Sequence, residues 1–257
     1  MNWARGVVVV SIASATACAR TTQPAETVKD GTTATGERRG QPEPEVQVWG
    51  ALRSVMHEGK TEGKVALQSI VPGPHSFAVG ALSELRGEVT ILDDDVVVSL
   101  GEPGGGVRTL AQPAPGEMAT LLVRAVVPSW TRHTIDHAIE SNRVDEEIES
   151  VVKSAGLDIG ARTPIVIEAK AKNLEWHVLG GRAQPGQNAH HGPRSVGKLS
   201  GATVTLVGFF SRNDVAVFTH MGEHSHFHVV TNGERMTGHV DSMALEPGAV
   251  VRLPARR

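Results

Sequence analysis

Histidine side chains gather in one short stretch near the carboxyl end of this 257-residue chain. The stretch, residues 218–240, holds five of the twelve histidines and few carboxylates. Imidazole binds zinc and other divalent transition ions well, whereas magnesium and calcium prefer oxygen ligands. Three imidazoles that converge on one ion leave coordination positions open, as in catalytic zinc sites. The stretch therefore predicts a site for zinc or another divalent transition metal; its histidines are His220, His224, His226, His228 and His239.

A β-hairpin is the element that would bring these imidazoles together. Side chains two residues apart on a strand share a face, so His224, His226 and His228 should point the same way. A turn-forming Asn-Gly pair follows at residues 232–233, and the chain would then return with His239 beside this row. We expect His226, His228 and His239 to ligate the metal ion. A chance clustering of surface histidines, which would bind metal loosely, is the alternative.

The composition of the whole chain excludes several classes of protein. A net charge of −3, without a basic patch interleaved with aromatics, argues against nucleic acid as a partner. Tyrosine is absent and aromatic residues make up 4% of the chain, so platforms for base stacking are not expected. The sequence also lacks an apolar run long enough to form a membrane-spanning helix in the mature chain.

The amino terminus has the form of an export signal. Arg5 precedes a short apolar run, residues 6–17, whose end is rich in small residues. The only cysteine, Cys18, follows at once, and this arrangement resembles a bacterial lipoprotein processing site. We therefore expect residues 1–18 to be a signal peptide, Cys18 to be lipidated, and the protein to be an exported, periplasmic or cell-envelope lipoprotein held to a membrane by its anchor. An ordinary cleaved signal with an incidental cysteine is the alternative.

The rest of the chain divides into a tether and one domain. Residues 19–44 are polar, rich in Thr, Gly, Pro and Glu, and nearly free of large apolar side chains, so we expect a disordered tether there. Residues 45–257 are enough to bury a substantial core. We divide this domain into an amino-terminal half, about residues 45–160, and a metal-bearing half, residues 161–257.

Hydrophobic patterning predicts an α+β fold with mixed or antiparallel sheets and a few helices. Helical spacing predicts one helix over residues 46–58, ending at Gly59, and another over residues 135–155, ending at Gly156. Short β-like runs separated by turn residues indicate strands on both sides of the second helix. These runs are residues 77–82, 88–92, 96–100, 118–127, 163–169, 174–179, 202–210 and 249–253.

Three motifs follow one another in a fixed order along the chain. The first is Phe77-Ala-Val-Gly-Ala-Leu-Ser-Glu-Leu-Arg-Gly-Glu88, and the second is the strand-like Gly201-Ala-Thr-Val-Thr-Leu-Val-Gly-Phe209. The third consists of His226-Phe-His228, nine further residues and Gly238-His239-Val240. Together they resemble the α-acetolactate decarboxylase family, and the chain is similar to a divergent, exported member of it.

The resemblance implies the family's two-part fold and its activity, the decarboxylation of acetolactate to acetoin or of a related 2-hydroxy-3-oxo acid. It also implies that the histidine site binds Zn²⁺ or another divalent transition metal, and that the protein is a homodimer. Glu88 is implied as the catalytic residue that handles the proton, and Arg182 as the residue that holds the departing carboxylate. His220 and His224, on the same face as the ligands, would contact the substrate.

The chain also departs from the family pattern. Ala81 stands in place of a threonine, and Trp176-His-Val-Leu-Gly-Gly-Arg182 replaces the segment that carries the family's substrate arginine. On the residues alone, Glu88 could instead be a solvated carboxylate at the start of a strand, and Arg182 a surface arginine. Two other functions therefore stay open: a lipid-anchored, non-catalytic zinc-binding or sensing module, and, less well supported, a cupin-type metalloenzyme.

Overall fold

The computed structural model of this chain describes residues 44–70, 73–183, 192–233 and 235–256. The predicted signal peptide with Cys18, and all but the last residue of the predicted tether, lie outside this range. Among the described residues, none of the helices is both long enough and apolar enough to cross a membrane.

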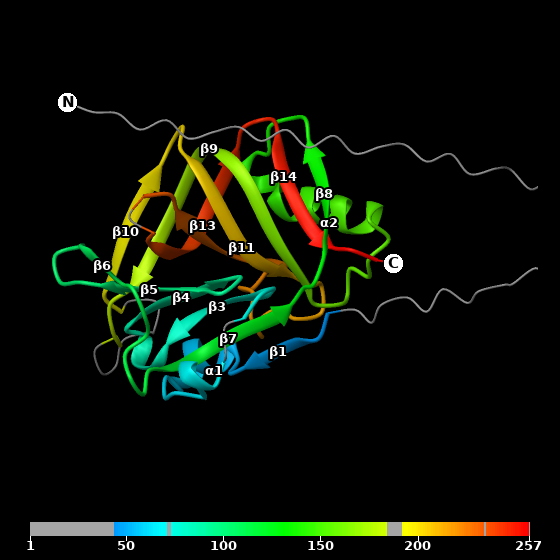
Figure 1. Ribbon diagram of the computed structural model, residues 1–257. Coiled ribbons are helices and arrows are strands. Elements are labelled where there is room, and N and C mark those ends of the chain that lie inside the picture. Colours follow the sequence, from blue (N-terminus) through cyan, green and yellow to red (C-terminus); the bar gives the residue numbers. More distant parts are fainter. Residues whose placement is uncertain (1–43, 71–72, 184–191, 234, 257) are drawn as a thin grey trace, which may run out of the picture. The chain divides into compact units, whose positions relative to one another are not determined.

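The first of two β-sheets comes from the amino-terminal part of the described chain (Figure 1). Its strand order is β1-β7-β3-β4-β5-β6, with β2 beside β7, and each pair is antiparallel. Short turns join β3, β4 and β5, where polar residues interrupt apolar runs, as expected for a meander. The strands are β1 (Val46–Trp49), β2 (Val65–Ala66), β3 (Ser76–Leu82), β4 (Gly87–Leu92), β5 (Asp95–Gly101), β6 (Val107–Leu110) and β7 (Met118–Val126).

The second sheet is organised around one long strand, β9. The first half of β9 pairs with β11 and its second half with β13. Since β12 bridges β11 and β13, these four strands close on themselves, and the histidine hairpin is held from both sides. The pairs are antiparallel. The strands are β8 (Trp130–Ile135), β9 (Thr163–Leu179), β10 (Arg194–Leu199), β11 (Thr203–Phe210), β12 (Ser225–Thr231), β13 (Thr237–Leu245) and β14 (Ala249–Pro254).

Two α-helices are present in the described residues, α1 (Leu52–Glu58) and α2 (Val144–Ser154), together with 3-10 turns at 67–69, 83–85 and 141–143. Both predicted helices were placed too early. Residues 46–49 form β1 because they pair with β7, and residue 135 ends β8, which pairs with β14. The predicted ends are confirmed, because Gly59 and Gly156 take the left-handed conformation that closes a helix.

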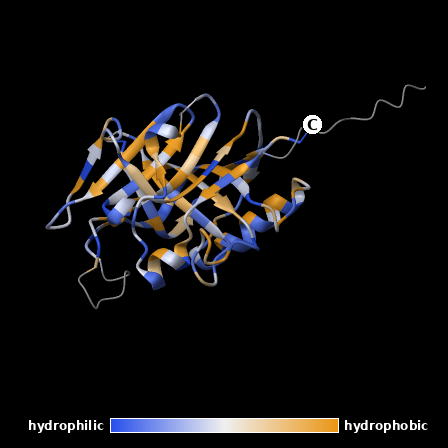
Figure 2. Ribbon diagram, turned by 90° about the horizontal axis from the view of Figure 1, so that it is seen from below, coloured by the Kyte–Doolittle hydropathy of each residue, from blue (hydrophilic) through white to orange (hydrophobic). Residues whose placement is uncertain are grey.

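Apolar side chains fill the space between the sheets and the space between the second sheet and α2. Phe77 and Val123 of the first sheet share one cluster with Val207 and Phe209 of the second. Ile148 of α2 belongs to a separate cluster on the opposite face of the second sheet. Figure 2 shows hydrophobic residues recurring along the strands. The prediction of antiparallel sheets is confirmed, but the helical share is small for an α+β protein.

Candidate metal centre

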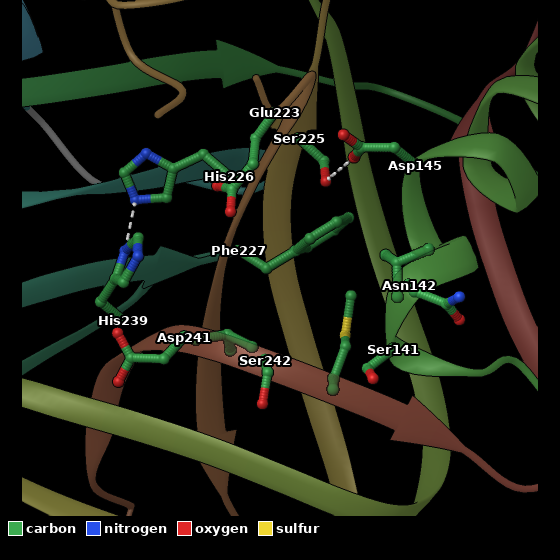
Figure 3. Close-up of a pocket in the computed structure, with 13 residues that line it drawn as sticks. Ser141, Asn142, Asp145, Glu223, Ser225, His226, Phe227, His239, Asp241 and Ser242 are labelled. Carbon is green, nitrogen blue, oxygen red and sulfur yellow. Dashed lines mark hydrogen bonds between the residues drawn. The ribbon is translucent and has the colours of Figure 1, made fainter. Parts of the chain in front are cut away.

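Three buried histidines converge where the two arms of the predicted hairpin meet. His226 and His228 lie two apart on β12, and His239 on β13 is the register partner of His228. One ligand nitrogen from each ring can be chosen so that all three lie within 4.8 Å of one another. The ring centroids of His226 and His239 are 4.8 Å apart, and Figure 3 shows a nitrogen of each ring pointing toward the other ring. The hairpin therefore gathers the three predicted ligands in one place.

Hydrogen bonds fix the orientation of two of these rings. Nδ1 of His226 lies 2.5 Å from the carbonyl oxygen of Phe218, to which only a protonated nitrogen can donate. Nδ1 of His228 lies 3.0 Å from Oγ1 of Thr90, which in turn lies 2.6 Å from Oγ1 of Thr237. Metal-ligating histidines usually donate their second ring nitrogen in this way, which leaves Nε2 with a free lone pair.

The remaining nitrogens of these rings fit a cation. Nε2 of His228 is buried without a hydrogen-bond partner in the described part of the chain, and Nε2 of His226 faces Nδ1 of His239 at 3.1 Å. Burial lowers the pKa of His226 to about 4 and lowers the pKa of His228 and of His239, with neighbouring imidazoles adding to the effect in all three. Neutral imidazole is the form that binds a metal ion. The donor set therefore suits zinc or another divalent transition ion.

Glu88 reaches this centre from the other sheet. It lies on β4, is 2% exposed, and its Oε2 is 3.7 Å from Nε2 of His228. Burial raises the pKa of Glu88 and nearby Asp241 raises it further, against the opposing effect of a backbone hydrogen bond from Leu179. Burial therefore disfavours the charged form of both Glu88 and His228. Glu88 is thus not the solvated carboxylate that the sequence left open.

The other predicted site residues lie at different distances from the centre. The ring of His220 lies 5.2 Å from that of His239. His224 precedes β12, and its ring lies 6.3 Å from that of Phe210. The side chain of Arg182 is 59% exposed, and its guanidinium bonds Glu84 at 3.0 Å. Of the three, His220 alone has a ring contact with the triad among the contacts that the structure describes.

Sequence reasoning missed His177 and Asp241. His177 on β9 is the register partner of His239, and their ring centroids are 4.9 Å apart. Asp241 follows His239 by two residues on β13 and lies 2.7 Å from Nδ1 of His177. In the sequence, His177 stood out only as part of the segment, residues 176–182, that replaces a motif of the family. Its place beside the ligands follows from the pairing of β9 with β13, and a pairing between distant strands cannot be read from the local sequence pattern.

A cavity of about 150 Å³ opens on the side of His226 and His239 (Figure 3). Its described lining contains no lysine or arginine. Burial raises the pKa of Glu223 at its wall, and Asp145 and Asp241 raise it further. The lining comprises Ser141, Asn142, Val144, Asp145, Glu223, Ser225, His226, Phe227, His239, Val240, Asp241, Ser242 and Met243.

The fold and the centre define a two-sheet β protein with a buried three-histidine site and a carboxyl group beside it. The family profile of alpha-acetolactate decarboxylase matches residues 50–253. The chain belongs to this family, whose members are carboxy-lyases. The cupin alternative is thereby set aside.

Solved structures share the fold at low sequence identity. Acetolactate decarboxylase from Bacillus subtilis subspecies spizizenii is 18% identical with a TM-score of 0.65, over 82% of this chain and 86% of that one. A Staphylococcus aureus protein, described as of unknown function and similar to alpha-acetolactate decarboxylase, is 15% identical with a TM-score of 0.60, over 82% and 85%. No curated protein matches the chain at a significant level.

Proposed function

We propose that this protein is a metal-dependent decarboxylase of acetolactate or a closely related 2-hydroxy-3-oxo acid. The observation that carries the proposal is the burial of Glu88 directly against the three-histidine centre, from a different sheet. A merely metal-binding module needs the histidines but gains nothing from a buried carboxyl group beside them. The cost of burying that group points instead to a reaction that uses it.

The reaction breaks the bond between C2 of the substrate and its carboxylate. The electron pair of that bond moves onto C2 and the oxygen of the C3 carbonyl, which gives an enediolate and CO2. A divalent ion at the triad supplies Lewis-acid stabilisation for the negative charge that develops on the substrate oxygens. The surrounding strands exclude water from the reacting carbon, because the three imidazoles and Glu88 are all buried.

Glu88 then delivers a proton to C2, which gives the 2-hydroxy ketone. Its raised pKa suits this role, because a carboxyl group that holds its proton to higher pH is better able to act as a general acid. We assign His220, which contacts His239, and His224 to substrate contacts. Arg182 would have to leave Glu84 in order to hold the substrate's carboxylate, so we assign it the weakest role in the site.

The decisive experiment offers racemic acetolactate to the metal-loaded protein and measures acetoin. Glu88→Gln keeps the shape and the hydrogen-bonding capacity of the side chain but removes its proton-donating carboxyl group. We expect turnover to fall by at least about a hundredfold, within the range that general acid catalysis contributes, while the metal content stays unchanged. Glu102→Gln is the matched control, because Glu102 is exposed and bonds Arg108 outside the site. Full activity in Glu88→Gln would remove Glu88 from the mechanism.

We further propose that the protein is an exported lipoprotein anchored through Cys18, and that it forms a homodimer. The sequence pattern of residues 1–18 and the family resemblance support these two proposals. Mass spectrometry of the amino-terminal peptide tests the lipid, with Cys18→Ala as the control. Light scattering of the purified protein tests the dimer.

A further inference from the structure

Three imidazoles form a row across three neighbouring strands. His228 on β12 pairs with His239 on β13, and His239 pairs with His177 on β9. Register partners put their side chains on the same face of a sheet, so His177 faces the same space as the two ligands. Its side chain is 12% exposed and therefore still accessible.

A β-bulge places a carboxylate on this third imidazole. Along β13, His239 and Val240 pair with His177 and Trp176, but Ser242 pairs with Glu175, so that Asp241 is the extra residue. Bulges re-aim a side chain, and they are common beside active sites. Here Oδ1 of Asp241 lies 2.7 Å from Nδ1 of His177.

This contact decides which ring nitrogen remains available. A carboxylate only accepts hydrogen bonds, so Nδ1 of His177 must be the donor. In a neutral ring the lone pair then belongs to Nε2, which makes no hydrogen bond with the described residues. Asp241 thus holds the ring of His177 beside the centre, and Nε2 of this ring is available as a hydrogen-bond acceptor. A metal-ligand role is not favoured, because His177 falls outside the group of nitrogens close enough to share one ion.

We propose that His177, oriented by Asp241, is a substrate-contacting residue whose Nε2 accepts a hydrogen bond from the substrate's 2-hydroxyl group. The hydroxyl is the one hydrogen-bond donor of an ionised 2-hydroxy-3-oxo acid, so this contact selects acids that carry a free hydroxyl next to the carboxylate. The inference rests on the proposed function only in taking such an acid as the ligand.

The test measures binding rather than turnover. The protein is loaded with Co²⁺, whose visible spectrum reports ligand binding, and titrated with 2-hydroxy-2-methylpropanoate and with its 2-methoxy counterpart. Neither compound has the 3-oxo group that decarboxylation needs. The wild-type protein should prefer the hydroxy acid, and in His177→Ala this preference should fall by roughly three- to tenfold, the value of one neutral hydrogen bond. His177→Gln, which can still accept a hydrogen bond, should recover part of it.

Two further variants separate this role from a structural one. Asp241→Asn should also reduce the preference, because an amide can donate to Nδ1 and so move the acceptor lone pair away from Nε2. His137→Ala should leave it unchanged, because His137 forms the same kind of pair with Glu147, at 3.1 Å, but has no ring contact with the triad among the described residues. An unchanged preference in His177→Ala, or a loss of Co²⁺ affinity as large as that of a triad variant, would overturn the inference. A wild-type protein that binds these acids but forms no acetoin would refute the proposed reaction and not this contact.

Discussion

The two faces of strand β12 are equally buried and chemically opposite. Phe227 and Val229 point into the apolar cluster under helix α2 and are at most 3% exposed. His226 and His228 point toward the first sheet and are at most 6% exposed. Because successive side chains of a strand alternate in direction, the seven residues of β12 supply Phe227 and Val229 to the core and His226 and His228 to the candidate metal centre.

The comparison shows where stability and function separate. Burial of Phe227 and Val229 stabilises the fold through the apolar area removed from water. Burial of imidazoles and of the Glu88 carboxyl costs free energy unless each polar atom finds a partner. One of those atoms, Nε2 of His228, lacks a partner within the described residues. Burial of the histidines therefore lowers the stability of the fold, and burial of the apolar side chains offsets this loss. A bound cation would remove much of the free-energy cost.

Removal of one of the metal-ligating histidines should have the largest effect, and this effect should fall on metal affinity. We expect His228→Ala to lower metal affinity by about a hundredfold to a thousandfold, one ligand's share of a zinc site's binding free energy, and to abolish acetoin formation. Isothermal titration with Zn²⁺ measures the affinity. His133→Ala, a change of the same kind on β8, should bind metal like the wild-type protein. Equal losses in both variants would mean that histidine replacement acts through general unfolding.

Removal of a side chain from the apolar face of β12 should have the reverse effect, a loss of stability without a loss of metal binding. Phe227→Ala leaves a cavity in the apolar cluster, and we expect the free energy of unfolding to fall by about 3–5 kcal/mol. The metal stoichiometry of the folded protein should stay at the wild-type value, because the ring points away from the ligands. Urea unfolding and metal analysis of the same sample check both parts. Loss of metal from folded Phe227→Ala would show that the two faces are not independent.

Acid should destabilise the metal-free protein, because the buried histidines of the site resist protonation in the folded state. A histidine whose pKa is lowered by folding binds its proton first in the unfolded state, so stability falls as the pH drops below the ordinary value near 6.5. For His226, whose pKa is about 4, the loss is about 3 kcal/mol between these two values. His228 and His239 act in the same direction.

Glu88 acts in the opposite direction in this pH range. Its raised pKa contributes stability that is fully present in acid, below its ordinary pKa, and is lost as the pH rises through the folded value. Metal-free Glu88→Gln should therefore lose stability more steeply than wild type as the pH falls from 6.5. Urea unfolding at stepped pH values measures both slopes. Parallel slopes would mean that Glu88 does not titrate differently in the folded state.

Much of the candidate metal centre could be predicted because its parts are local. His226 and His228 obey the two-residue period of a strand, and a short hairpin returns His239 to them. The strand positions were also readable, since apolar runs and turn residues alternate along the chain. The starts of both helices could not be predicted, because the residues ahead of α1 and α2 form strands that pair with β7 and β14.

The remainder of the site depends on pairings between distant segments. Asp241 meets His177 only because a bulge in β13 shifts the register against β9. Thr90 meets His228 only because the two sheets pack face to face, 138 residues apart in the chain. No local pattern specifies either contact, and the role of Glu88 was inferred from family resemblance rather than from its own neighbourhood.

Thr90 offers the finest test of the contrast between the two faces. Thr90→Val keeps the shape of the side chain but removes the hydroxyl that lies between His228 and Thr237, so the imidazole of His228 loses the partner that orients it. We expect about a tenfold loss of metal affinity, as for other partners of ligating histidines.

Thr120→Val is the matched control for this variant. Thr120 is also fully buried in the first sheet, but its hydroxyl donates to the carbonyl oxygen of Lys60. Both variants remove a hydrogen-bonding hydroxyl from a fully buried threonine, so both should lower the melting temperature. Only Thr90→Val should weaken metal binding, and this difference can be read from Zn²⁺ titrations of the two proteins. Equal metal affinities would mean that the backbone and the packing of β12 are enough to hold His228, and that the hydroxyl of Thr90 contributes to stability alone.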